Sequence, residues 1–264
     1  ALDIFRRMDD QSGVASALLF QVLAWWLHGD ADRAQRLAVE AARIARHAGP
    51  RTMSSATAYL LGGIAWQSGR LSEAEDRLEV AVELARAAGN LAHESYAIIY
   101  SAYLHEDLGD YVTAYAQWVV SHAIHKRLGL LSGWHAIRSA ACARALDRPG
   151  AARIHWEEAL SLFAEGGDNE GVLHARLALA DWHMVCGCVD EAQEQLRHAT
   201  EAGVSLEDDD GIRACFNILA RLRYARGHRE SAVRLLGFAR ERGVVERAAR
   251  RLNVCRLLEP AADA

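Results

Sequence analysis

Lysine is almost absent from this 264-residue chain, and the single one, Lys126, follows no glycine-rich loop. A phosphate-binding P-loop needs such a loop ending in lysine, so the sequence excludes that nucleotide site. Proline is also scarce, with 3 residues against 20 glycines, which argues against linkers and disorder. We therefore expect a chain that is folded throughout.

Cysteines and long apolar runs are limited as well. Five cysteines form an odd set in a chain this long, so we expect reduced thiols and a cytoplasmic location rather than a disulfide framework. The longest apolar run, residues 14–27, includes Ser16 and Gln21 and is shorter than the ~20 residues that a membrane span needs. A net charge of −5 and a pI near 6.2 disfavour direct contact with nucleic acid. No membrane partner is expected either.

A repeat of about 40 residues runs along the chain. All units but the fourth have a glycine at the same position; every unit has an alanine five residues after that position, and most have a large apolar residue nine residues after it, as in GDYVTAYAQW from Gly109 to Trp118. The alanines are separated by 40, 40, 38, 40 and 40 residues, and they are Ala34, Ala74, Ala114, Ala152, Ala192 and Ala232. Such regular spacing predicts an array of structural repeats.

Each period is predicted to hold two helices, because apolar residues recur three and four apart and never alternate. The first helix should end at a turn residue with a left-handed backbone, which is Asp147 in the fourth unit and a glycine in the others: Gly29, Gly69, Gly109, Gly187 and Gly227. The second helix should begin at a capping box, at Asp32, Ser72 and Asp190. In the fifth unit the second helix should end near Gly203, with residues 207–210 forming a solvated loop.

The expected fold is thus an all-α solenoid of about six helix-turn-helix repeats. Residues 14–242 would form the six repeats, and residues 243–264 a C-terminal capping helix and tail. Residues 1–13 would end a truncated upstream repeat, because Ala1 to Phe5 with Gly13 matches Ala159 to Phe163 with Gly171 at an offset of 158. We therefore expect this chain to be a piece of a longer protein.

These offsets of small residues, large apolar residues and glycine resemble the tetratricopeptide repeat, which stacks antiparallel helix pairs into a right-handed superhelix. The period is longer than the usual 34 residues of that family, and the closing proline is missing. The phrases ALDIFRRMDDQSG, GDYVTAYAQW and SAVRLLGFARERG further resemble the tetratricopeptide region of large multidomain bacterial regulators. These include LuxR-type ATP-binding regulators, the maltose-regulon activator and antibiotic-pathway activators. The resemblance implies a sensing or docking arm whose partners include an upstream switch domain of the same polypeptide.

In the tetratricopeptide family, the first helices line a concave groove, with inward positions thirteen, ten, six and three residues before the turn. Applied to this sequence, these positions predict a groove for a peptide or protein partner, or for a small-molecule effector. Its candidate residues are Trp26, Tyr59, Trp66, Tyr96, Tyr103, Glu106, Trp134, Arg144, His174, Asp181, Asn217, Arg221 and Tyr224. Arg144 and Arg221 could clamp a carboxylate or phosphate. In the alternative, the charged residues pair with one another and the aromatic rings fill the superhelix.

Other chemistry has weaker support. His122 and His125 lie three apart on one helical face, and His183 lies near Cys186 and Cys188, but nothing completes a metal site in either case. No catalytic motif is found, so we expect no enzyme activity, no metal and no cofactor. The arginines near the C-terminus could contact DNA, but a solvated face of a capping helix explains them better. Exposed aromatic residues also leave self-association possible. The expected function is a ligand- or protein-binding module of a transcriptional regulator, and the alternative is an assembly scaffold without a small-molecule ligand.

Overall fold

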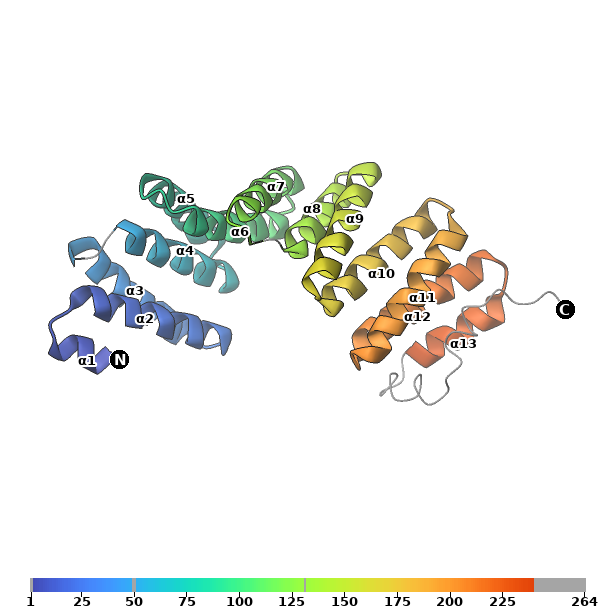
Figure 1. The fold of residues 1–264 in the computed structure, drawn as a ribbon, viewed down its shortest axis with the longest axis horizontal. Helices are drawn as coiled ribbons and strands as arrows, with labels where there is room; N and C mark the ends of the chain where they lie inside the picture. The colour runs from blue at the N-terminus through green and yellow to red at the C-terminus, as the bar shows by residue number, and fades with distance from the viewer. Residues whose placement is uncertain (1, 49–50, 131, 240–264) are drawn as a thin grey trace. The chain divides into compact units, whose positions relative to one another are not determined.

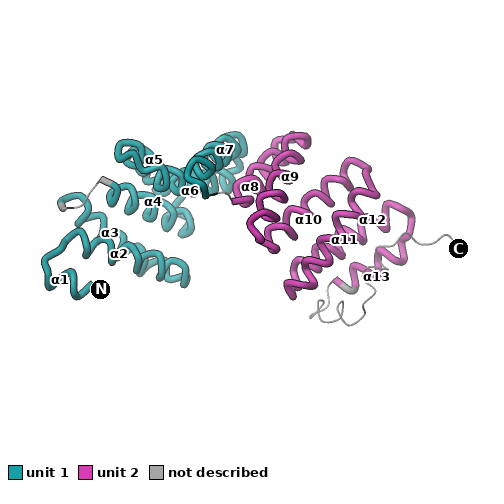
Figure 2. Tube along the Cα trace, in the orientation of Figure 1, with its two compact units in different colours: residues 1–131 teal, residues 132–264 magenta. Residues whose placement is uncertain are grey.

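A computed structural model describes residues 2–48, 51–130 and 132–239, and all of the regular structure in these ranges is helical (Figure 1). The chain divides into two compact units, residues 1–131 and residues 132–264 (Figure 2). Unit 1 contains α1 (Leu2–Arg7), α2 (Gln11–Leu27), α3 (Ala31–Ala48), α4 (Arg51–Gln67), α5 (Leu71–Ala87), α6 (Leu91–Asp107) and α7 (Tyr111–Arg127). Unit 2 contains α8 (Gly133–Ala145), α9 (Pro149–Gly166), α10 (Asn169–Val185), α11 (Val189–Ser205), α12 (Asp209–Ala225) and α13 (Arg229–Ala239).

From α2 onward, the helices form the predicted pairs, and the all-α prediction is confirmed. We call α2, α4, α6, α8, α10 and α12 the first helices and their partners the second helices. Each turn between the two is left-handed where the sequence predicts it: Gly109 has φ 77°, and Asp147, which replaces glycine, has φ 55°. The Gly109 amide donates to the Glu106 carbonyl at 3.0 Å, which closes the end of α6.

The predicted starts of the second helices are wrong by two residues. The helices begin directly after a cap residue that adjoins the turn, so Asp32, Ser72 and Asp190 already lie inside them. Asp30 accepts a hydrogen bond from the Arg33 amide at 3.0 Å, whereas the cap residues before α5 and α11 make no side-chain cap bond. The turn is therefore tighter than the capping-box pattern indicated.

The acidic run at residues 207–210 is only partly a connection, because Asp209 and Asp210 lie inside α12. Helix α11 continues through Gly203 to Ser205, and Glu207 takes the left-handed turn position with φ 54°. Asp208 caps α12 by accepting hydrogen bonds from the amides of Asp210 and Gly211, both at 3.0 Å. Carboxylates at a helix start are stabilised by the free amides and the helix dipole, which explains the position of Asp208, Asp209 and Asp210 at the start of α12.

Small residues bring the helices into close contact. The alanines five residues after the turn are 0–4% exposed in all six pairs. A Cβ atom on Gly13 would lie 2.3 Å from the Phe5 ring, and one on Gly171 would lie 2.2 Å from the Phe163 ring. The same close approach of a glycine and a phenylalanine ring therefore occurs at both positions of the 158-residue offset.

The division into 1–13, 14–242 and 243–264 stays a prediction, and both Gly243 and the expected capping helix lie outside the described residues. Among the helices that the structure describes, none has the length and apolar character needed to cross a membrane.

Candidate functional site

The predicted groove residues of unit 1 form a cluster of rings from three successive first helices. Trp66 stacks on Tyr103 with ring centroids 5.3 Å apart, and Tyr59 stacks on Tyr96 at 5.6 Å. We call Trp26, Tyr59, Trp66, Tyr96, Tyr100 and Tyr103 the aromatic cluster. Most of its members are partly exposed, and Tyr96 is 42% exposed, so the cluster presents apolar surface to solvent.

Tyr100, which the groove positions did not include, lies at the centre of this cluster. Its ring centroid is 5.3 Å from that of Trp26, 6.3 Å from that of Tyr59 and 6.4 Å from that of Trp66. Trp26 on α2 reaches Tyr100 on α6 across Gly63 of the intervening α4, where a Cβ atom would lie 2.5 Å from the Trp26 ring. The missing side chain at Gly63 is therefore what allows three helices to share one set of rings.

The indole groups tie each first helix to the next. Nε1–H of Trp26 donates to Oε1 of Gln67, and Nε1–H of Trp66 donates to Oδ2 of Asp107 at 2.7 Å. The two bonds join equivalent positions, because each donor and each acceptor is displaced by 40 residues. Glu106 accepts from the Trp118 indole at 2.5 Å, so it contacts its own repeat's second helix instead.

Burial raises the pKa values of tyrosines in the cluster, which are uncharged at neutral pH in any case. Burial and the neighbouring Tyr96 raise the pKa of Tyr59 to about 12, and burial with the neighbouring tyrosines also raises the pKa of Tyr100. Burial lowers the pKa of His93, whose Nδ1 lies 2.8 Å from the Ser55 hydroxyl oxygen. The cluster thus offers neutral rings beside the carboxylate of Asp107.

The predicted groove residues of unit 2 form separate, smaller groups. The Trp134 ring, 40% exposed, contacts the rings of Phe163 and His174 at centroid distances of 5.1 and 5.5 Å. His174 also lines an open cleft of about 530 Å³ between α10 and α12. The other residues that line it are Glu170, Leu177, Leu206, Asp208, Asp210, Gly211 and Ala214.

Asp181 pairs with both predicted arginines of unit 2. Its carboxylate lies 3.4 Å from Arg144 Nη1 and also pairs with Arg221 Nη1. These three residues therefore pair with one another, as the alternative to a ligand clamp predicts for them. Both arginine side chains are more than half exposed, at 64% and 55%, and two guanidinium groups share one carboxylate.

Asn217 and Tyr224 are exposed, and the structure does not bring them into the ring contacts of Trp134. The Arg229 guanidinium lies 6.0 Å from the Tyr224 ring centroid, at the limit of a cation–π contact. These two positions therefore lie in the predicted register without forming part of a described cluster.

The weaker candidates of the sequence have local explanations. His125 is buried, with Nδ1 3.0 Å from the Ser95 hydroxyl, so it belongs to the packing between α6 and α7. Cys186 and Cys188 flank the turn at Gly187 and remain free thiols. Over residues 2–48, 51–130 and 132–239, no three His, Cys, Asp or Glu side chains gather as metal ligands would.

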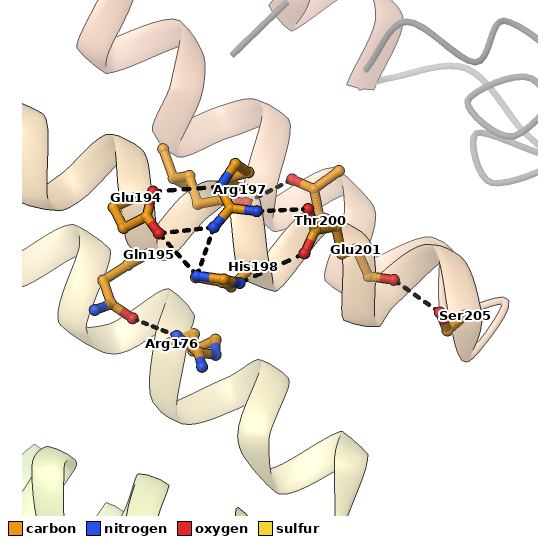
Figure 3. Close-up of polar contacts among 9 residues, drawn as sticks. Arg176, Glu194, Gln195, Arg197, His198, Thr200, Glu201 and Ser205 are labelled. Carbon is orange, nitrogen blue, oxygen red and sulfur yellow. Dashed lines mark hydrogen bonds and ion pairs between the residues drawn. The ribbon is translucent and has the colours of Figure 1, made fainter. Parts of the chain in front are cut away.

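Figure 3 shows a further polar cluster, which lies along α11. Arg197 donates to Glu194 at 2.7 Å and to Glu201 at 2.8 Å, and His198 Nε2 lies 2.8 Å from Glu194. The hydrogen bond from Arg197 lowers the pKa of Glu194 to about 2. Partners three and four residues apart on one helix stabilise that helix, so this cluster is explained by local structure alone.

No protein-family model and no curated protein matches the sequence. Solved structures do match the fold. BtubC from P. vanneervenii has a TM-score of 0.67 at 18% identity, and the match covers 94% of this chain and 96% of that one.

A signal transduction ATPase with a tetratricopeptide repeat sensor, from Pyrococcus horikoshii, has a TM-score of 0.76 at 13% identity, over 95% of this chain and 39% of that one. A Rap protein complexed with Competence and Sporulation Factor has a TM-score of 0.57 at 11% identity, over 91% and 74%. The chain therefore has the fold of the tetratricopeptide-like helical solenoids.

Proposed function

We propose that this chain is a binding module that takes a peptide segment of a partner protein on the first helices of its repeats. The aromatic cluster of unit 1 carries the proposal. Six rings from three helices form one partly exposed surface, with Tyr96 42% exposed. Aromatic side chains supply large contact area at a small cost in conformational entropy, which is why they are enriched at binding surfaces.

Unit 2 would contribute polar recognition of its own. Arg144 and Arg221 together carry one positive charge more than Asp181 neutralises, and their side chains are accessible. A guanidinium group can donate to a carboxylate through two parallel hydrogen bonds. An acidic side chain or a C-terminal carboxylate of a partner would suit this pair.

We further propose that the module belongs to a regulator and senses or docks rather than catalyses. Two fold neighbours support this context: an ATPase described by its tetratricopeptide repeat sensor, and a Rap protein in complex with a factor. The sequence resemblance to multidomain transcriptional regulators agrees with it. In such a protein, binding would favour one curvature of the repeats and so act on an attached switch domain.

A plain assembly scaffold is the second candidate, because the Asp181 pairs and the stacked rings already satisfy much of the first-helix surface. A small-molecule effector would favour the sensor instead. A thermal-shift screen of metabolites separates these two, because a ligand that binds the folded state raises the unfolding temperature.

Selection of a phage-displayed library of random 12-residue peptides on the full chain tests peptide binding directly. We expect enriched peptides whose affinity falls about tenfold or more in Tyr96→Ala, the loss of an exposed aromatic contact. Tyr111→Ala is the matched control, because Tyr111 is 37% exposed but belongs to the second helix α7. If no peptide is enriched, or if both variants bind equally well, the proposed function is wrong.

A further inference from the structure

The basic residues of unit 1 are segregated between its two sets of helices. Residues 1–131 contain 12 Lys and Arg residues, and among the residues assigned to α2, α4 and α6 only Arg51, the first residue of α4, is one of them. The first helices of unit 2 carry six: Arg138, Arg144, Arg176, Arg213, Arg221 and Arg223. The scarcity of basic residues is thus a property of the aromatic surface and not of first helices in general.

The acidic residues on the first helices of unit 1 are all on α6. Glu94 is paired with Arg86 of α5 at 2.8 Å, and Glu106 accepts from the Trp118 indole. Asp107 is exposed, and its carboxylate accepts a hydrogen bond from the neutral indole of Trp66. The aromatic surface therefore ends at a solvent-accessible carboxylate.

The preceding repeat shows that holding the tryptophan does not require this charge. Gln67 occupies the position equivalent to Asp107, and its neutral amide oxygen accepts from Trp26 as Asp107 accepts from Trp66. A carboxylate keeps further lone pairs after it has accepted one hydrogen bond. The negative charge of Asp107 is therefore not needed to hold the Trp66 indole, and it can bind a cation.

The rings beside this carboxylate suit a guanidinium group in particular. Trp66 and Tyr103 are stacked with an interplanar angle of 16°, and both are partly exposed. Arginine binds to aromatic faces and donates to carboxylates at the same time, because its guanidinium is planar and weakly hydrated. One arginine side chain could thus use the Trp66–Tyr103 stack and the Asp107 carboxylate together.

We propose that unit 1 recognises an arginine side chain of the partner peptide, held by Trp66, Tyr103 and Asp107. This inference rests on the proposed peptide-binding function and specifies the chemistry of the partner. The rings contact the guanidinium plane and its alkyl stem, and Asp107 accepts its hydrogen bonds. Tyr96 and Tyr59, farther along the same surface, contact other side chains of the peptide.

The test uses the 12-residue peptides selected on the full chain. We expect arginine to be enriched in them, and replacement of the arginine by citrulline, which is neutral and nearly isosteric, to weaken binding about tenfold. Asp107→Asn should cause the same loss while keeping an oxygen for the Trp66 indole. Asp76→Asn, an exposed carboxylate on α5, should leave affinity within about twofold.

A double substitution identifies the pair. On Asp107→Asn, the difference in affinity between the arginine and citrulline peptides should shrink to the smaller part that the rings contribute, because the charge pair is already lost. Peptides that depend on Tyr96 but show no arginine excess, or a citrulline effect that is undiminished in Asp107→Asn, would overturn the arginine site and leave peptide binding intact. Absence of any Tyr96-dependent peptide would instead reject the proposed function itself, and the arginine site with it.

Discussion

Replacement of Gly63 by alanine tests the geometry on which the aromatic cluster depends. Two opposing effects set the magnitude. Alanine is more favourable than glycine inside a helix by about 0.8–1.0 kcal/mol. Against this, the new Cβ would lie 2.5 Å from the Trp26 ring and 3.4 Å from the Tyr100 ring, and overpacking of this kind costs about 1–3 kcal/mol. The variant should therefore be less stable than the wild type by up to about 2 kcal/mol.

Gly237→Ala is the matched control, because Gly237 lies in helix α13 with no atom within 4 Å of an added Cβ. Its free energy of unfolding should rise by up to about 1 kcal/mol. Urea unfolding followed by circular dichroism and tryptophan fluorescence measures both changes. Trp26→Phe shortens the ring and should recover part of the loss in the Gly63→Ala background. If Gly63→Ala is stabilised as much as Gly237→Ala, then Trp26 and Tyr100 do not meet across α4.

Two further predictions concern pH and the turns. The raised pKa values of Tyr59 and Tyr100 mean that the folded state holds their protons more tightly than the unfolded state does, which stabilises the fold. This contribution to stability is complete below pH 10 and is lost as the pH rises towards about 12. Urea midpoints measured over this pH range should fall less in Tyr59→Phe than in the wild type, and an equal fall would contradict the burial of the Tyr59 hydroxyl. Gly109→Ala should lower the free energy of unfolding by about 1 kcal/mol, and with it the urea midpoint, because alanine is strained at φ 77°. An unchanged midpoint would contradict the left-handed turn.

The repeat pattern predicted the helix pairs and their turns because both depend on short-range chemistry. The left-handed residue after each first helix is either a glycine or Asp147, and the spacing of alanines sets where helices touch. The sequence does not predict the start of α12, because an acidic run is compatible with both a solvated loop and a helix start. The left-handed conformation of Glu207 determines that α12 begins at Asp209, and the sequence does not reveal this conformation.

The candidate site was predicted in part. Counting back from each turn finds the direction in which a side chain points, so Tyr59, Trp66 and Tyr103 were identified. The count does not show how far a ring reaches. Tyr100 occupies a register position that Leu60 fills in the preceding repeat as buried core, and it enters the cluster only because Trp26 crosses Gly63. Contacts between repeats that are not adjacent are therefore invisible to a repeat-by-repeat analysis.

The six repeats separate the residues that build the fold from those that distinguish one repeat from another. The alanine five residues after the turn is invariant and buried, because a larger side chain would force the helices apart. Three residues before the turn, in contrast, the chain has Trp26, Trp66, Glu106, Arg144, Met184 and Tyr224. Packing between the helices of a pair does not dictate this position, so its chemistry can change without loss of the repeat. For the proposed peptide binding, differences in preference between units 1 and 2 should therefore arise on the first helices, and substitutions there should alter binding more than they alter the fold.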